Sequence, residues 1–404
     1  MAALEGPSRR YLVTGGCGFI GSHCCLELLK AGHSVTVLDD LSNSSPESLV
    51  RVRGACHAHC DALLPLTAPS QPPAELFGID AADDRLVFVE CDLCDKAALD
   101  AAVAAWSTCA ACIHFAGLKS VGESVRDPLA YYTCNVGGTL ALLDALRKHG
   151  IRRIVFSSSA TVCVVCAVAR APPVKKKRSP PPPFPRYGTA PVPITEQSPV
   201  GAGITNAYGR TKYVIEEILR DFAASPEGQG WSIMILRYFN PVGAHPSGRI
   251  GEDPNGPPNN LMPYVAQVAI GRRPKLTVFG ADYDTPDGTG VRDYIHVMDL
   301  VDGHLAALGY LDANGAGAYT FNLGTGKGFS VLEMVKAMEE ASGRPIAYEV
   351  GPRRAGDLAS VYADTATAER DLGFKCSRSL VDMCADLWRW QVANPEGFAT
   401  GGGK

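Results

Sequence analysis

The feature that most constrains the fold is a glycine-rich turn between two apolar stretches near the start of the chain. An apolar run at residues 11–14 leads into "TGGCGFIGSHCCLELLKAGHSVTVLDD". Gly15, Gly18 and Gly21 give the pattern G-x-x-G-x-x-G, helical spacing of apolar residues follows, and a second apolar run ends at Asp39, 24 positions after Gly15. A glycine triplet alone is weak evidence, but a strand, the triplet, a helix, a strand and a final acid together predict a dinucleotide-binding unit.

Each part of this unit has an expected role. The glycines let the backbone approach a pyrophosphate at the start of the helix, where N–H groups and the helix dipole favour anions. Asp39 is expected to accept hydrogen bonds from the adenosine ribose hydroxyls. A carboxylate there repels a 2′-phosphate, and Asp40 beside it adds to the effect, so NAD is favoured over NADP. The alternative interpretation is an ordinary tight turn.

Strand-like and helical stretches continue to alternate along the chain. "RLVFVECDL" (85–93), "CIHFAG" (112–117) and "IRRIVFSSSATV" (151–162) are apolar runs, and a long helical stretch covers about 123–148. Continuous apolar strands separated by helices predict an α/β fold with a doubly wound parallel sheet of the Rossmann type, and ligands at the carboxyl ends of its strands. Asp92, Phe115–Gly117 and Ser157–Ser159 are expected at such ends.

A helical segment at 206–219, "NAYGRTKYVIEEIL", carries Tyr208 and Lys212. Four residues apart on a helix, both side chains face the same way. Past residue 240 the alternation loosens and Gly, Pro and Asn become frequent, before a tryptophan-containing helical tail. We therefore expect a Rossmann domain over 9–240 and a smaller C-terminal α/β substrate-binding lobe, mainly over 241–398 and interleaved with the first.

Composition limits the class of partner and the location. The 404 residues carry a net charge of −4, which argues against nucleic acid as the main partner because phosphate binding needs a basic face. The first ten residues lack an apolar signal core, and no run reaches the ~18 apolar residues that span a bilayer. A cytoplasmic protein without a membrane segment is expected.

The fourteen cysteines include three C-x-x-C pairs, Cys91/Cys94, Cys109/Cys112 and Cys163/Cys166. A zinc site needs two such pairs brought together. Cys56, His57, His59 and Cys60 form the strongest metal candidate in the sequence. We expect no metal site, and interpret the cysteines as reduced thiols.

Several motifs together resemble one family. "TGGCGFIG", "HFAGLKSVGESV", "FSSSATV", "YGRTK", "LRYFNPVGAH", "NNLMPY", "VFGADYDTPDGTGVRDYIHV" and "NLGTG" are similar to the UDP-glucose 4-epimerases, which belong to the extended short-chain dehydrogenase/reductase superfamily. The resemblance runs from about residue 10 to 398, apart from two stretches. The later motifs are specific to the epimerases rather than to the superfamily.

The resemblance implies an enzyme of galactose metabolism that interconverts UDP-glucose and UDP-galactose at C4 through a 4-keto intermediate, with tightly bound NAD. Tyr208 is expected to act as the base, Ser159 to hydrogen-bond O4 and relay the proton, and Lys212 to bind the nicotinamide ribose. A tyrosine pKa near 10 is too high for this work. We expect the Lys212 ammonium and the nicotinamide ring to lower it.

The remaining expected contacts fall into two sets. By resemblance, the cofactor-binding residues are Gly15, Gly18, Phe19, Ile20, Gly21, Asp39, Asn43, Ser44, Asp92, Leu93, Phe115, Ala116, Gly117, Lys119, Asn135, Ser157, Tyr208, Lys212 and Tyr238. The substrate-binding residues are Lys119, Ser159, Phe239, Asn240, Asn260, Leu261, Thr277, Phe279, Arg292, Arg354, Asp357 and Val361. Arg292 and Arg354 suit a diphosphate, and Asp357 suits uridine ribose hydroxyls.

The family also implies a homodimer and a point of sugar specificity. Helices near 123–148 and 207–222 are expected at the dimer interface. Val361 aligns with a position near the hexose C2 that is usually tyrosine in members restricted to UDP-glucose and UDP-galactose, and small in members that also accept N-acetyl sugars. A one-residue shift of the alignment would place Tyr362 there instead.

Two stretches interrupt the resemblance, at about 54–74 and at 163–186. The second contains "KKKRSPPPPFPR", and without it "SSSATV" joins "YGTAPVPITE" as in the family, while the separation of Ser159 from Tyr208 falls from 49 to 25 positions. Both have prolines near their ends, as a translated pyrimidine-rich splice tract would. Three interpretations stay open: translated introns, a real exposed insertion, and a docking motif.

Two other functions compete with an epimerase. One is a different NAD-dependent nucleotide-sugar enzyme of the superfamily, such as a 4,6-dehydratase or a decarboxylase. Dehydratases typically carry Asp-Glu beside the serine, whereas this chain reads Ser159-Ala160-Thr161. The other is a chain that its insertions have disrupted, serving only as an NAD-binding or polyproline-docking protein.

Overall fold

The computed structural model describes residues 7–57, 85–163, 192–256, 258–354 and 357–398. Most of the two stretches at 54–74 and 163–186 lies outside these ranges, together with the basic proline-rich run. His59, Cys60 and Cys166 also lie outside them. Within the described part of the chain, no helix is long and apolar enough to cross a membrane.

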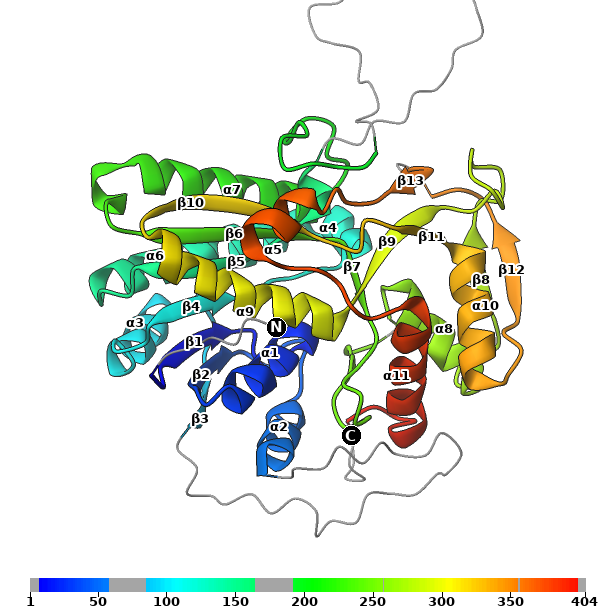
Figure 1. The fold of residues 1–404 in the computed structure, drawn as a ribbon, viewed down its shortest axis with the longest axis horizontal. Helices are drawn as coiled ribbons and strands as arrows, with labels where there is room; N and C mark the ends of the chain where they lie inside the picture. Colours follow the sequence, from blue (N-terminus) through cyan, green and yellow to red (C-terminus); the bar gives the residue numbers. More distant parts are fainter. Residues whose placement is uncertain (1–6, 58–84, 164–191, 257, 355–356, 399–404) are drawn as a thin grey trace, which may run out of the picture.

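A seven-stranded parallel sheet organises the first part of the chain (Figure 1). Its strand order is β10-β6-β5-β4-β1-β2-β3, and every pair is parallel. The strands are β1 (Arg10–Thr14), β2 (Ser34–Asp39), β3 (Leu86–Glu90), β4 (Ala111–His114), β5 (Arg153–Ser159), β6 (Ser232–Tyr238) and β10 (Gly317–Leu323). The doubly wound α/β fold expected from the sequence is confirmed.

Helices cover both faces of this sheet because alternate strand residues point to opposite sides. Val13, Val37 and Val155 pack on one side against α1 and α9, and Leu12, Leu38 and Phe156 pack on the other against α3, α6 and α7. The helices are α1 (Phe19–Lys30), α2 (Glu47–His57), α3 (Lys96–Ala105), α4 (Val121–Arg126), α5 (Pro128–Tyr131), α6 (Gly138–Lys148), α7 (Ala207–Ala224) and α9 (Val297–Asn314).

The helix expected over about 123–148 is broken into pieces. Helix α4 ends at Arg126, and the Asp127 side chain accepts a hydrogen bond from Ala130 N (3.1 Å), so that Asp127 starts α5. Pro128 supplies no N–H to continue the preceding helix. A π-helical turn, η2 (Tyr132–Gly137), then precedes α6 and carries Asn135. Such turns inside helices are frequent at functional sites.

The later residues build a second, smaller cluster of elements with its own buried core. Helices α8, α10 and α11 pack on one another beside two short sheets, β11-β9-β13 with β7 on β9, and β12-β8 (Figure 1). These elements are β7 (Asn240–Val242), α8 (Leu261–Ala269), β8 (Leu276–Phe279), β9 (Val291–His296), β11 (Gly328–Ser330), α10 (Val331–Ser342), β12 (Tyr348–Gly351), β13 (Ser360–Val361) and α11 (Leu380–Ala393).

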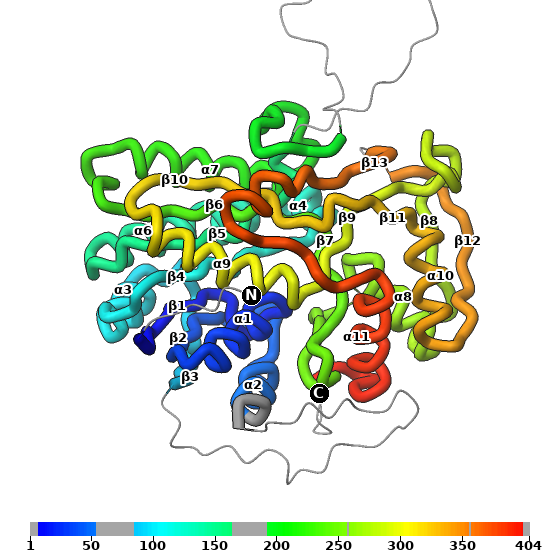
Figure 2. Tube along the Cα trace, viewed as in Figure 1, coloured from blue at the N-terminus to red at the C-terminus, as the bar shows by residue number. Residues whose placement is uncertain are grey.

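The chain returns to the large sheet between these pieces. Helix α9 and strand β10 follow β9, and the tube in Figure 2 shows their yellow segment lying among the earlier elements. Strand β10 pairs with β6 over the whole length of both strands. The two parts of the molecule are therefore interleaved along the sequence.

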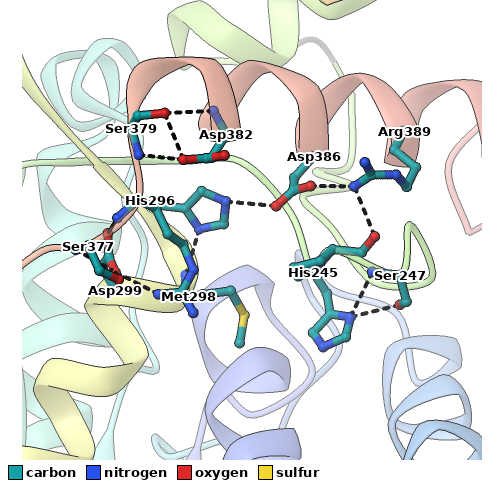
Figure 3. A network of polar contacts seen from close by, with 12 residues as sticks. His245, Ser247, His296, Met298, Asp299, Ser377, Ser379, Asp382, Asp386 and Arg389 are labelled. Atoms are coloured by element: carbon teal, nitrogen blue, oxygen red, sulfur yellow. Dashed lines mark hydrogen bonds and ion pairs between the residues drawn. The ribbon is translucent and has the colours of Figure 1, made fainter. Parts of the chain in front are cut away.

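A polar network fixes α11 to the start of α9 (Figure 3). His296 accepts a hydrogen bond from Met298 N (3.0 Å) at the start of α9, and its Nε2 lies 3.2 Å from Asp386 Oδ2 on α11. Asp386 also pairs with Arg389, whose guanidinium donates to Pro246 O (2.9 Å). Three segments far apart in the sequence are thereby joined at one buried point.

Candidate active site

The turn after β1 is built so closely that it requires glycine. Gly15 has φ +71°, and a Cβ there would lie 2.6 Å from Ala116 N. A Cβ on Gly21 would lie 2.2 Å from Gly15 O, and one on Gly18 would lie 3.3 Å from the same oxygen. Helix α1 begins at Phe19, and no described side chain caps its first turn. The unpaired N–H groups of that turn are therefore left for a ligand.

Asp39 ends β2 beside this turn and is 7% exposed. Its carboxylate accepts hydrogen bonds from Cys17 N (2.9 Å), Leu41 N (3.0 Å) and Ser44 Oγ (2.8 Å). Burial raises the pKa of Asp39, and these hydrogen bonds oppose the rise. An ionised carboxylate has about four acceptor sites, so one remains for a ribose hydroxyl.

The next strand ends lie along the same edge of the sheet. Asp92, after β3, accepts a hydrogen bond from Cys94 N (2.8 Å), and Phe115–Gly117 follow β4 directly. The Asn135 side chain holds the backbone that follows β4: it accepts a hydrogen bond from Leu118 N (2.8 Å) and donates one to Leu118 O (3.0 Å). The residues predicted at these two strand ends are thus brought to the same edge of the sheet as Asp39.

Tyr208, Lys212 and the serines of β5 form the polar centre of the edge. Lys212 is 5% exposed, and its Nζ donates to Ser157 O (2.7 Å) and lies 4.8 Å from the centre of the Phe156 ring. Tyr208 is partly exposed, and the Ser159 side chain is near enough to its hydroxyl to act on the Tyr208 pKa. The Ser159 hydroxyl also accepts from Thr161 N (3.2 Å) and Thr161 Oγ1 (3.0 Å).

The expected lowering of the Tyr208 pKa by Lys212 is not found in the protein alone. Burial raises the pKa of Tyr208, and the nearby Ser159 side chain opposes the rise without cancelling it. The Lys212 ammonium is directed at the Ser157 carbonyl oxygen instead. The expectation that Lys212 and the nicotinamide ring together lower this pKa stays a prediction for the protein with its cofactor bound.

Burial also lowers the pKa of Lys212, to about 8 from its ordinary 10.5. Because the folded pKa lies below the unfolded one, the charged lysine reduces stability at pH 7, and this cost falls as the pH rises from 8 toward 10.5. Relative to Lys212→Met, the NAD-free wild type should gain about 2 kcal/mol in the free energy of unfolding between pH 7 and pH 9.5. Urea unfolding at both pH values measures the difference, and a constant difference would contradict the burial of a charged Lys212.

Several of the residues expected to bind substrate contact one another or neighbouring strands. Arg292 on β9 lies 3.6 Å from Asp357 and donates to Leu358 O (2.9 Å), and Val361 on β13 is its Cα partner in the parallel pairing. The Arg354 guanidinium stacks 3.9 Å from the centre of the Phe279 ring. Val361 also packs against a buried cluster that includes Phe239 and Ala160, the residue that follows Ser159.

Comparison with known proteins gives a consistent result. A family model described as the NAD dependent epimerase/dehydratase family matches residues 11–324. The chain is 51% identical over 388 residues to the UDP-glucose 4-epimerase of Bacillus subtilis, covering 96% of this chain and 98% of the relative. It is 48% identical over 400 residues to that of Homo sapiens, covering 97% and 99%. The chain belongs to the UDP-glucose 4-epimerase family.

Solved structures support the same assignment. The UDP-glucose 4-epimerase of Bifidobacterium longum, solved in complex with NAD+ and UDP, matches with a TM-score of 0.79 and 44% identity, covering 96% of this chain and 99% of that one. The epimerase resemblance seen in the sequence is therefore confirmed, and NAD is the cofactor of the family.

The described residues fit the NAD of this family. The glycines of the turn have no side chains that would keep a pyrophosphate away from the backbone. The first turn of α1 also offers free N–H groups. The hydroxyl of Tyr238 is buried and has no hydrogen-bond partner among the described residues, although Ser157 is near enough to oppose the rise that burial causes in the Tyr238 pKa. A ligand that supplies this missing partner would complete the site.

One contact in this epimerase site was not predicted from the sequence. Glu252 Oε1 lies 2.7 Å from Lys119 Nζ and 3.3 Å from Asn260 Nδ2, so it joins two expected ligand-binding residues from different parts of the chain. Nearby, Asn255 N donates to Asn43 Oδ1 (3.1 Å). Glu252 lies in "GEDPNGPPNN", where no periodic pattern indicates which side chain points inward.

Other predicted residues have partners that do not decide their role. Thr277 Oγ1 lies 3.5 Å from Glu349 on the neighbouring strand, and Asn240 donates to Asp293 O (2.9 Å). No group of three or more His, Cys, Asp and Glu side chains suited to a metal occurs in the described part of the chain. The side chains of the Cys56–Cys60 group are not among the described ones.

Proposed function

We propose that this protein interconverts UDP-glucose and UDP-galactose by inverting C4 of the hexose, with NAD retained between turnovers. The observation that carries the proposal is the Tyr208–Ser159 pair at the end of β5, with Lys212 one turn further along the same helix. The Tyr208–Ser159 pair lies at the same edge of the sheet as the glycine turn, and the chain belongs to the epimerase family.

The proposed chemistry divides the work between cofactor and protein. NAD, held at the glycine turn and by Lys212, would supply the acceptor and donor for the hydride, and its oxidised form would add a positive charge. Tyr208 takes the O4 proton and gives it back, and Ser159 orients O4 and relays the proton. Lys212 would hold the nicotinamide ribose from its buried position over Phe156.

Charge and position support the proposed binding of the UDP part. Arg292 and Arg354 bring two guanidinium groups to the substrate side, and such groups pair well with a diphosphate. Asp357, next to Arg292, is proposed to take the uridine ribose hydroxyls. Lys119, held by Glu252, would contact both ligands from the end of β4.

The direct test is incubation with UDP-galactose and no added cofactor, followed by separation of the nucleotide sugars. We expect UDP-glucose to form, and NAD or NADH without NADP to appear when the purified protein is denatured. A protein that needs stoichiometric added NAD+ would be an ordinary dehydrogenase instead. Formation of a 4-keto-6-deoxy product would favour a dehydratase, and NAD binding without any turnover would favour a non-enzymatic role.

We also propose the division of the chain into a Rossmann domain over 9–240 and a lobe mainly over 241–398. The separate buried core around α8, α10 and α11 supports it. Strand β10 and helix α9 would belong with the first domain despite their late position in the sequence. A cytoplasmic location remains part of the proposal and rests on the sequence alone.

A homodimer is proposed through the face that carries α4, α5 and α6. Val125 is 63% exposed and Leu129 is 76% exposed, and Val121 and Leu140 are also exposed on these helices. Leu129→Lys should convert a dimer into a monomer, because a charge cannot be buried unpaired in an apolar interface. Sedimentation velocity measures the mass, with Val350→Lys as the control, since Val350 is 57% exposed on β12. A wild-type monomer would contradict the proposal.

Val361 is proposed to leave room for N-acetyl sugars. It packs against the buried cluster that includes Ala160 and Phe239, and a tyrosine there is expected to overfill the space. We expect the wild type to interconvert UDP-GlcNAc and UDP-GalNAc. Val361→Tyr should lower that activity by about tenfold or more while sparing UDP-galactose. Absence of UDP-GalNAc turnover by an enzyme active on UDP-galactose would disprove this role.

A further inference from the structure

Helix α7 faces strand β5 with three polar residues in a row, of which the proposed chemistry uses only two. Tyr208, Lys212 and Glu216 are spaced by four positions and therefore share one face of the helix. Each contacts one of three consecutive serines. Tyr208 lies near the Ser159 side chain, Lys212 donates to Ser157 O (2.7 Å), and Glu216 accepts from Ser158 Oγ (2.5 Å).

The contact between Glu216 and Ser158 is the most buried of the three. Glu216 is fully buried, and Ser158 is 1% exposed. Ser158 lies on the same face of β5 as Ile154 and Phe156, because strand residues two positions apart point the same way. Ile154 and Phe156 belong to the same buried cluster as Ile215 and Leu219 of α7, so Ser158 points toward that helix. Substrate would enter at the exposed end of the row, so Glu216 is placed away from the reacting atoms.

Four hydrogen bonds hold the Glu216 carboxylate. Oε1 accepts from Ser158 and from Arg237 Nε (2.9 Å), and Oε2 accepts from Arg237 Nη2 (2.6 Å) and Arg220 Nη2 (2.7 Å). Arg237 lies on β6, is 2% exposed, and also donates to Glu196 O (3.2 Å). The two-point contact between a guanidinium and a carboxylate fixes direction as well as distance.

Stability does not explain this arrangement well. Replacing a buried ion pair by apolar residues of similar size is often neutral or stabilising, because both charges must lose their water. What the pair does provide is a defined position of α7 against both β5 and β6. A helix held only by Ile215 and Leu219 could shift along the sheet, since apolar contacts are not directional.

We propose that Glu216 is a positioning residue for the reaction, and that its contacts with Ser158 and Arg237 set the place of Tyr208 over Ser159. This inference rests on the proposed function, because it assigns Tyr208 as the base. A displacement of the base by about 1 Å can lower the rate by about a hundredfold. The row of three contacts transmits the position of the buried carboxylate to the partly exposed phenol two turns away.

Ser158→Ala is the first test, because it removes the link between Glu216 and β5 and keeps the ion pair. We expect kcat for UDP-galactose to fall about tenfold with KM nearly unchanged, since a misplaced base affects the chemical step rather than binding. The apparent pKa in the pH profile of kcat should also move, because the Tyr208–Ser159 contact changes. The amount of NAD released on denaturation should stay the same.

The matched control is Glu217→Gln. Glu217 is the next residue of the same helix, bonds the same Arg220 (2.6 Å), and is exposed. The Glu217→Gln variant should leave kcat and the pH profile unchanged. A second variant, Glu216→Met with Arg237→Met, removes both buried charges together and should show the same fall in kcat and the same shift in its pH profile.

The outcomes separate the inference from the proposed function. If wild type epimerises and Ser158→Ala keeps its kcat and pH profile, Glu216 has no positioning role, whatever the double variant does. If the double variant fails to fold, Ser158→Ala alone decides. If Ser158→Ala loses NAD and activity together, the contact is merely structural and the inference is wrong. A wild type without epimerase activity would overturn the proposed function itself.

Discussion

Replacing Tyr208 by phenylalanine is expected to lower kcat by about 10²- to 10⁴-fold, the usual contribution of a positioned acid or base. The substitution removes the hydroxyl that lies near Ser159 and keeps the aromatic ring. NAD should still be released in full when the variant is denatured. The measurement is initial-rate conversion of UDP-galactose, together with the NAD content of the same preparation.

Lys212→Met gives the comparison for this result. It removes the ammonium that donates to Ser157 O, so both turnover and NAD retention should fall. The two variants should therefore differ in NAD content while both lose activity. If Tyr208→Phe kept nearly full activity, another residue would be the base.

The second large effect is expected for Gly21→Ala. The added methyl group would lie 2.2 Å from Gly15 O and 2.8 Å from the Gly16 Cα, and both are backbone atoms that cannot move aside without opening the turn. The start of α1 would shift, and the first-turn N–H groups would no longer converge on a pyrophosphate. We expect NAD to be absent from the purified variant, and its thermal unfolding to occur at a lower temperature.

Gly122→Ala is the matched control. Gly122 lies in α4, its φ is not positive, and an added Cβ would meet nothing within 4 Å. An alanine there should keep NAD and raise stability slightly, because glycine costs up to about 1 kcal/mol in a helix. If Gly21→Ala retained NAD as well as Gly122→Ala does, the glycine turn would not be the pyrophosphate site.

Local patterns predicted the large sheet because its strands are buried on both sides. Continuous apolar runs at 11–14, 85–93 and 112–117 became β1, β3 and β4 with shifts of a few residues. Spacing also placed Tyr208 and Lys212 on one helix face, as the structure shows. The break at Asp127 was not predicted, because the periodic apolar pattern continues past Pro128. The helix itself cannot continue there, since proline has no N–H to donate.

Contacts between segments far apart in the sequence could not be predicted from local residue patterns. Strand β13 is two residues long and pairs with β9 about seventy positions earlier, so no run of residues indicates it. In the protein without its cofactor, burial raises the Tyr208 pKa, and sequence spacing does not show that Lys212 donates to a carbonyl oxygen. Glu216 could have been found by extending the four-residue spacing one step beyond Lys212.

The late arrival of β10 has a consequence for synthesis on the ribosome. Strand β6 ends at Tyr238, and its neighbour β10 begins at Gly317, 79 positions later. Translation at about 5–20 residues per second leaves roughly 4–16 s during which one edge of β6 has no partner. Every residue of β6 is buried in the finished protein, and an unpaired apolar edge is a template for wrong pairing. A nascent chain stalled between these strands should therefore be the form most in need of a chaperone.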